Sequence, residues 1–187
     1  MLNRRRQPAG KSIGAREPVH PNDHVNMGQS SNDVIPSAIH ISAAEELKNH
    51  LIPPLEDLAT ELEKKAQEFH DVIKIGRTHL MDATPVRLGQ EFGGYAQQVR
   101  HGIRRAEQAI VALQELALGG TAVGTGLNRH PDFPGKVMRH PEQRTGIPFR
   151  EAARQFQAQG VKDAVGEVSG PPQASGVGRL HTHNHVA

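Results

Sequence analysis

The feature that most constrains the fold is residues 88–118, in which apolar residues recur at steps of seven. Two such rows interleave: Phe92, Val99, Ala106 and Leu113, and Ala96, Ile103, Ile110 and Ala117. Because heptad rows keep apolar side chains on one side of a helix, this pattern predicts one long helix packed against other helices. At about 1.5 Å per residue it would be about 45 Å long. A compact chain of 187 residues cannot cover that length fully, so we expect a partner chain to bury the rest.

Weaker helical patterns precede this segment. A helix is predicted to begin at Ser31 or Asn32, either of which can cap it, with Pro36 in or near the first turn. Its expected apolar face is Ile35, Ile39, Ala43 and Leu47. The pair Pro53-Pro54 predicts a break or kink, followed by an amphipathic helix with Pro54 in its first turn. Its expected apolar face is Leu55, Leu58, Leu62, Ala66 and Phe69, with a Glu61–Lys65 pair on the far side.

The pair Gly119-Gly120 is predicted to end the long helix. A loop of small residues is expected over 119–128, with further helices near 132–143 and 151–168. The predicted organisation is an irregular segment at 1–19, a helical domain at 20–169 and a disordered tail at 170–187. The tail's histidines, His181, His183 and His185, are expected to belong to this disordered segment and not to a metal site.

Composition narrows the fold and the function classes. Only 36% of the residues are hydrophobic and 3% aromatic, so the core must be aliphatic, which favours an all-α fold of helices packed on helices. The absence of cysteine excludes disulfides, zinc–thiolate sites and thiol catalysis. A net charge of +2 is too small to indicate nucleic-acid binding, and no apolar run approaches the roughly 20 residues that span a bilayer.

Three polar segments interrupt the helical patterns. They read HPNDHVNMGQSSND at 20–33, GRTHLMDATP at 76–85 followed by LGQEF, and ALGGTAVGTGLN at 117–128. In the second, which lies in the predicted connection between two helices, His79 is flanked by hydroxyl groups that can hold an anion. His79 is therefore a candidate acid or base. On the residues alone, His79 could instead be a solvated loop residue. Residues 30–32 could simply cap a helix, and residues 20–23 could form a turn.

Taken together, the three segments resemble class II fumarase, a member of the fumarase/aspartase superfamily, and the match holds from about Gly14 to Ser169. The Thr78-His79 pair and the Ser30-Ser31-Asn32-Asp33 run favour fumarase, since aspartases tend to carry Gln after the Thr and a Ser-Thr-Asn-Asp run. The resemblance implies an all-α enzyme whose long helices from four subunits form a central bundle. Each active site would collect segments from three chains.

The resemblance also implies an activity: reversible hydration of fumarate to L-malate, with no cofactor or metal. It assigns proton transfer to His79 and substrate binding to Ser30, Ser31, Asn32 and Thr78. A secondary dicarboxylate site would consist of His20, Pro21, Asn22 and Asp23. The implied partners are fumarate and L-malate, with further copies of the chain or an intact fumarase. The implied compartment is the cytoplasm, with the mitochondrion as the alternative.

The sequence departs from the family in two places. Residues 1–187 contain neither the family's Gly-Ser-Gly-Thr motif nor its Ser-Ser-x-Met-Pro-Gly-Lys-x-Asn loop, which carries the catalytic serine. After Gly170, where the family continues a core helix, the sequence turns to PPQASGVGRLHTHNHVA. We therefore expect a fumarase fragment that is inactive alone. The alternatives are a non-catalytic remnant or helical interaction partner, and an aspartase-type lyase.

Overall fold

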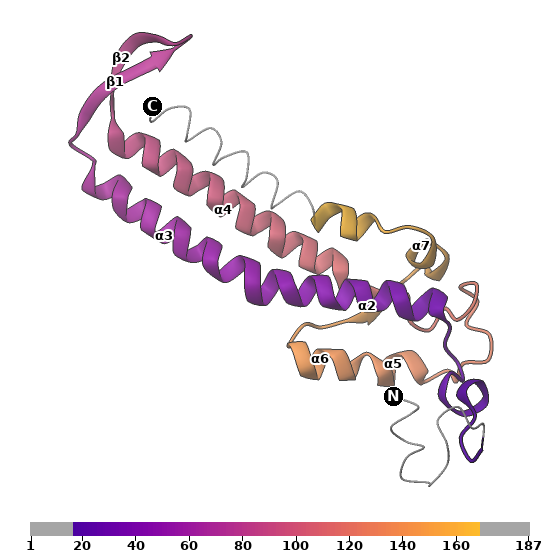
Figure 1. Ribbon diagram of the computed structural model, residues 1–187. Helices are drawn as coiled ribbons and strands as arrows, with labels where there is room; N and C mark the ends of the chain where they lie inside the picture. Colours follow the sequence, from indigo (N-terminus) through magenta and orange to yellow (C-terminus); the bar gives the residue numbers. More distant parts are fainter. Residues whose placement is uncertain (1–16, 169–187) are drawn as a thin grey trace. The chain divides into compact units, whose positions relative to one another are not determined.

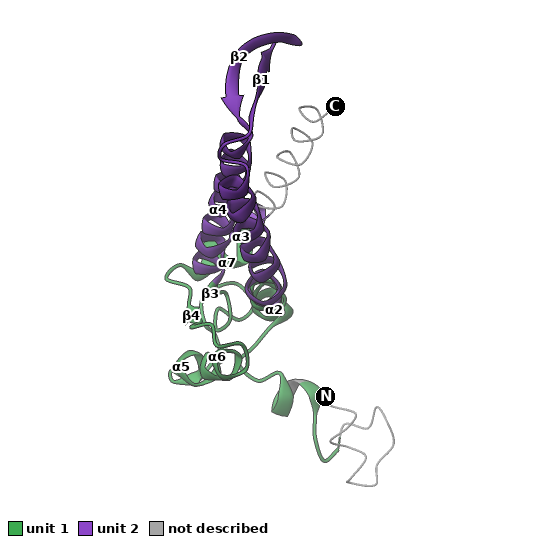
Figure 2. Ribbon diagram, turned by 90° about the vertical axis from the view of Figure 1, so that its left-hand side faces the viewer, with its two compact units in different colours: residues 1–41, 114–162 green, residues 42–113, 163–187 purple. Residues whose placement is uncertain are grey.

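The chain divides into two compact units, residues 1–41 with 114–162 and residues 42–113 with 163–187 (Figure 2), and the computed structural model describes residues 17–168. Each unit is described by itself below, the first as unit 1 and the second as unit 2. The predicted tail, with its three histidines, and most of the predicted N-terminal segment lie outside the described residues. The predicted domain limits stay predictions.

Helices dominate the described residues, which confirms the predicted all-α class (Figure 1). The α-helices are α2 (Ser31–Glu46), α3 (Ile52–Glu68), α4 (Leu88–Leu113), α5 (Phe133–Val137), α6 (Arg139–Thr145) and α7 (Gln155–Gly160). Two π-helical turns, η2 (Pro21–Val25) and η3 (Leu47–Leu51), accompany them. The strands β1 (Ile73–Thr78) and β2 (Met81–Arg87) form one small sheet, and β3 (Glu115–Leu116) and β4 (Arg150–Glu151) form another.

Unit 2 is built on α3 and α4, which run side by side along most of their length (Figure 1). A core of Leu55, Ala59 and Ile103 lies between them, with Leu51, Ile52 and Val99 partly buried against it. The heptad rows are confirmed within α4, because Ala96, Ile103, Ala106 and Leu113 are buried. Gly102 and Ala109 are buried on the same helix. Small side chains at these positions allow close approach between the helices.

The predicted end of the long helix near residue 118 is wrong, because α4 ends at Leu113. Glu115 and Leu116 instead pair in parallel with Arg150 and Glu151. The Arg150 N–H donates to the Gln114 carbonyl at 2.9 Å, and the Ala152 N–H donates to the Leu116 carbonyl at 2.9 Å. Leu116 and Ala117 are still buried. Their apolar character fitted the heptad pattern although the backbone there is not helical.

The predicted apolar face of α2 is wrong in its first half. Ile35 and Ile39 are 56% and 38% exposed, whereas Pro36 lies inside the helix and is buried. The buried polar side chains are Asp33, Ser37 and His40. The Ser37 hydroxyl donates to the Asp33 carbonyl at 2.7 Å, and His40 Nδ1 lies 2.8 Å from the Glu115 carbonyl oxygen. Many polar groups on this face have hydrogen-bond partners and can therefore be buried. A pattern of apolar residues could not indicate that this face is the buried one.

The predicted break at Pro53-Pro54 is wrong, because the π-helical turn η3 leads directly into α3 and the backbone at Leu51 and Ile52 stays helical. Both prolines lie in the first turn of α3, as expected for Pro54. The predicted Glu61–Lys65 pair is wrong: Glu61 pairs with Lys64 at 2.5 Å, and Lys65 pairs with Glu68 at 2.6 Å. The helix expected near 132–143 divides into α5 and α6. The helix expected at 151–168 begins only at Gln155, and residues 163–168 form a separate helical stretch.

One ion pair within unit 2 leads to a prediction about pH. Arg100 donates from Nε and Nη2 to the two Glu63 carboxylate oxygens, both at 2.8 Å. These hydrogen bonds lower the pKa of Glu63 below its ordinary value near 4.5. Because the folded-state pKa is the lower one, the pair stabilises the fold fully above the ordinary value and loses this effect as the pH falls through the folded value.

We therefore expect Glu63→Gln to lower the free energy of unfolding at pH 7 and to leave it unchanged at a pH below both values. Urea unfolding at the two pH values measures the difference. Glu61→Gln is the matched control, since its pair with Lys64 is more exposed and should contribute little. Equal destabilisation by Glu63→Gln at both pH values would contradict the assignment.

Candidate functional site

Ser30 directly precedes α2, and Ser31 and Asn32 lie in the first turn of this helix in unit 1. The Ser30 hydroxyl accepts the Asn32 N–H at 3.2 Å, and the Asp33 carboxylate accepts the Ser30 N–H at 2.8 Å. This reciprocal arrangement is a capping box. The cap is therefore Ser30, and the expectation of Ser31 or Asn32 as the cap is wrong. Because capping uses neither of those side chains, both stay exposed and available to a ligand.

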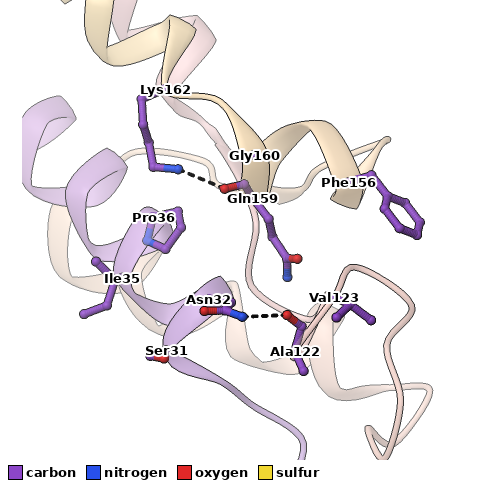
Figure 3. A pocket seen from close by; sticks show the side chains of 10 residues that line it. All are labelled: Ser31, Asn32, Ile35, Pro36, Ala122, Val123, Phe156, Gln159, Gly160 and Lys162. Atoms are coloured by element: carbon purple, nitrogen blue, oxygen red, sulfur yellow. Dashed lines mark hydrogen bonds between the residues drawn. The ribbon is translucent and has the colours of Figure 1, made fainter.

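Ser31 and Asn32 line a cleft of about 580 Å³ within unit 1 (Figure 3). Its walls include the apolar side chains of Ile35, Pro36, Val123 and Phe156. Asn32 donates from Nδ2 to the Ala122 carbonyl at 2.7 Å, which fixes the orientation of its amide.

The charge of this cleft comes from Lys162. Lys162 is the charged residue of the lining, and no acidic side chain is among the described residues that line it. The lysine ammonium donates to the Gln159 carbonyl at 3.1 Å and to the Val161 carbonyl at 3.5 Å (Figure 3). Neither partner is charged, and no ion pair neutralises this lysine within residues 17–168. A cleft with hydroxyl, amide and ammonium donors suits an anion.

Residues 76–85 connect two helices, α3 and α4, as predicted, but they are not an irregular loop. They form most of an antiparallel hairpin in unit 2, in which Thr78 pairs with Met81 across a turn of His79 and Leu80 (Figure 1). Both turn residues have positive φ, 52° and 60°. A two-residue hairpin turn of this kind usually contains Asn-Gly, and positive φ is uncommon for His and Leu. The sequence therefore lacked the ordinary signal for a hairpin.

The side chains at the hairpin tip are uncovered. Thr78 and His79 are exposed, and Leu80 is 99% exposed. Across the hairpin, Arg77 Nε donates to Asp82 Oδ1 at 3.2 Å. Within residues 17–168, no hydrogen bond reaches the His79 imidazole, so the described part of the chain does not fix its tautomer. Proton transfer in a controlled direction requires a further surface that covers His79.

The predicted turn at residues 20–23 overlaps the π-helical turn η2 in unit 1. His20 Nδ1 lies 3.1 Å from Asp23 Oδ2, and the His20 N–H donates to His24 Nδ1 at 2.8 Å. Pro21 and Asn22 contribute backbone to the turn. Because Asp23 itself faces His20, an incoming carboxylate would have to displace it. The secondary dicarboxylate site stays a prediction.

A protein-family model described as "Lyase" matches residues 4–174 of this chain. The chain belongs to this lyase family. It is 57% identical over 165 residues to a class II fumarate hydratase of Halobacterium salinarum, covering 88% of this chain and 35% of that protein. It is 48% identical over 184 residues to a mitochondrial fumarate hydratase of Danio rerio, covering 98% of this chain and 36% of that protein.

The solved class II fumarase of Schistosoma mansoni superposes on this chain with a TM-score of 0.90 at 36% sequence identity. The match covers 97% of the present chain and 41% of that one. These likenesses confirm the resemblance to class II fumarase. The present chain spans about a third of the length of the curated relatives it matches.

The predicted site residues of this chain fall into two groups. Ser30, Ser31 and Asn32 belong to unit 1, together with residues 20–23, whereas Thr78 and His79 belong to unit 2. Sequence reasoning missed Lys162, which follows a short helix and had no local signal. It also missed the role of Asp33, although the spacing Ser30-x-x-Asp33 is close to that of a capping box.

The described residues were also expected to lack metal sites and membrane spans. Residues 17–168 contain no group of three or more His, Asp or Glu side chains placed to hold a metal ion. In the same part of the chain, every helix is too short or too polar to span a lipid bilayer.

Proposed function

We propose that this lyase chain is part of a fumarate hydratase, in which it supplies a dicarboxylate-binding cleft and the proton-transferring histidine. The observation that carries the proposal is the cleft whose lining contains Ser31, Asn32 and Lys162 and, among the described residues, no acidic side chain (Figure 3). A hydroxyl, an amide and an ammonium group in the lining of one cleft provide donors for a carboxylate. The printed names of the relatives support fumarate and L-malate as the substrate pair.

The chemistry of the reaction fits these residue types. Hydration adds the hydroxyl of water to one carbon of the double bond and a proton to the other, without a redox change or a cofactor. His79 would accept the proton released by the attacking water, with the Thr78 hydroxyl beside it as a hydrogen-bonding group. The negative charge that develops next to the second carboxylate would be stabilised by the donors of Ser30, Ser31 and Asn32.

The exposed hairpin tip implies that other subunits complete the site. Thr78 and His79 are exposed, and the adjacent Leu80 and Met81 are 99% and 72% exposed. Further copies of the chain, or an intact fumarase, would cover this surface and exclude water from the reaction. The proposed assembly is the tetramer of the family, in the cytoplasm, although the Danio rerio relative is named as mitochondrial.

Fumarate titration of the purified chain, followed by NMR, tests the cleft directly. Lys162→Ala and Asn32→Ala should each weaken fumarate binding by about tenfold or more, because each removes a donor to the bound carboxylate. Lys136→Ala is the matched control, since Lys136 is an exposed lysine of unit 1 that pairs with Asp132 at 3.5 Å. Affinity that is unchanged in all three variants, or no binding by the unmodified chain, would contradict the proposal.

A non-catalytic helical interaction partner is the second candidate. The observation that favours it is the His79 imidazole, which has no hydrogen-bond partner within residues 17–168. In this case the chain would bind through its helices and contribute no proton transfer. Turnover measured with the unmodified chain separates the two candidates.

A further inference from the structure

Asp33 is a buried carboxylate whose contacts all lie within unit 1. It is fully buried, and no ion pair neutralises it within the described residues. Three backbone N–H groups donate to it instead. The Ser30 N–H donates to Oδ1 at 2.8 Å, and the Gly119 and Thr121 N–H groups donate to Oδ2 at 3.1 and 2.9 Å. Hydrogen bonds to an ionised acceptor are the stronger kind.

The two donors of the loop converge because its backbone adopts an unusual conformation. Gly119 has φ 105° and Thr121 has φ 57°. The N–H groups on either side of Gly120 thereby point at one anion, the chain's own Asp33, while the Gly120 N–H donates to the Ala117 carbonyl at 3.1 Å. Positive φ is strained for a threonine, so the loop needs contacts that hold it. Asp33 provides one, and Gln159 provides another by donating from Nε2 to the Thr121 carbonyl at 2.8 Å.

The contacts of Asp33 are linked to the cleft through the hydrogen bond between Asn32 and Ala122. Ala122 directly follows Thr121, and its carbonyl accepts the Asn32 amide at 2.7 Å. Asn32 directly precedes Asp33. The carboxylate therefore fixes both partners of this hydrogen bond, the first turn of α2 on one side and the loop on the other.

We infer that Asp33 is the positioning residue of the cleft. Its buried carboxylate fastens residues 119–121 to the first turn of α2 and thereby orients the Asn32 amide. The inference rests on the proposed function for the identity of the ligand. Asp33 itself does not touch the ligand, because all its observed contacts are to backbone N–H groups.

Asp33→Asn tests this role without a change in side-chain size. The asparagine oxygen can still accept on one side, but its NH₂ group would face N–H donors on the other. We expect amide hydrogen exchange at Gly119 and Thr121 to accelerate by about tenfold or more, and the Asn32 side-chain amide to lose its protection. Fumarate affinity should fall by about tenfold, as for loss of one good donor. Asp132→Asn, at an exposed acid of unit 1, is the control and should change none of these.

The amides of Arg150 and Ala152, which bond to Gln114 and Leu116, report whether the fold persists. If Asp33→Asn disrupts them too, adding Thr121→Gly should restore them, since glycine adopts the positive φ without strain. The Asn32 side-chain amide should stay unprotected in this double variant. Failure of the double variant to restore the fold, or protection of the Asn32 amide in it, would overturn the inference.

Two other outcomes would also overturn it: free exchange of Gly119 and Thr121 in the unmodified chain, or an Asn32 amide that is unaffected by Asp33→Asn. Failure of the unmodified chain to bind fumarate would instead overturn the proposed function alone. The exchange measurements need no ligand, so they still decide the role of Asp33. Faster exchange at all three amides, with the Arg150 and Ala152 amides unchanged, supports it.

Discussion

Gly89→Ala should destabilise the helix pair of unit 2 by about 1–3 kcal/mol or more, the range for overpacking a filled interior. Gly89 is buried at the start of α4, where its N–H donates to the Phe69 carbonyl at 3.0 Å. A Cβ added there would lie 2.3 Å from the Ala66 carbonyl oxygen and 3.1 Å from the His70 backbone. Because the obstacle is backbone, no side-chain rotation relieves the clash, and α3 or α4 must move.

Gly94→Ala is the matched control in the same helix. A Cβ at Gly94 meets nothing within 4 Å. Alanine there should stabilise the fold by about 0.5–1 kcal/mol, because glycine is the poorer helix former. Urea unfolding of the two variants should therefore give changes of opposite sign. Stabilisation by both substitutions would show that α3 and α4 do not approach as closely as Gly89 indicates.

The long helix shows how far sequence patterns reach. The heptad rows predicted α4 and its buried face, because the buried positions of a helix carry apolar residues at regular spacing in the sequence. They did not predict its end at Leu113, since the partner that makes Glu115 and Leu116 extended is β4, at residues 150–151. A pattern that is local in sequence contains no information about a hydrogen-bonding partner so far along the chain.

Buried polar side chains and an unusual hairpin turn explain the other predictions about the fold that were wrong. The inner face of α2 holds Asp33 and His40, which are hydrogen-bonded and carry no hydrophobic signal. The hairpin turn at His79 and Leu80 has positive φ at two residues that seldom adopt it. For α2 the partner that allows polar burial is far along the chain, and for the hairpin the pairing of β1 with β2 imposes a turn that its two residues do not favour.

The candidate site residues also differ in how far the sequence alone indicates them. Ser30–Asn32 and His79 could be proposed because they occur in long motifs that resemble class II fumarase. Lys162 could not, because one lysine after a short helix is indistinguishable from a solvated charge until the fold brings it into the lining of the cleft that also contains Asn32 (Figure 3). Asp33 was visible as a motif residue, but its role depends on a loop 86–88 residues away.

His79→Ala is expected to reduce fumarate hydration by about 10²–10⁴-fold, the range for removal of a general acid or base. His79→Gln should reduce it comparably, because glutamine can hydrogen-bond to water but cannot accept its proton. A spectrophotometric fumarate–malate assay measures the change. His101→Ala is the control, since His101 is an exposed histidine of unit 2 that hydrogen-bonds to Gln97 on α4. Equal turnover by all variants would assign the proton transfer to another group.

The assay also decides between the two candidate functions, provided that fumarate binding is measured on the same samples. Binding with turnover that depends on His79 would support the hydratase. Binding without turnover by the unmodified chain would support the non-catalytic partner, since the Ser31–Asn32 cleft would then be intact while the exposed hairpin lacks the surface that catalysis requires. If intact class II fumarase is then added and His79-dependent turnover appears, that missing surface is supplied by another subunit.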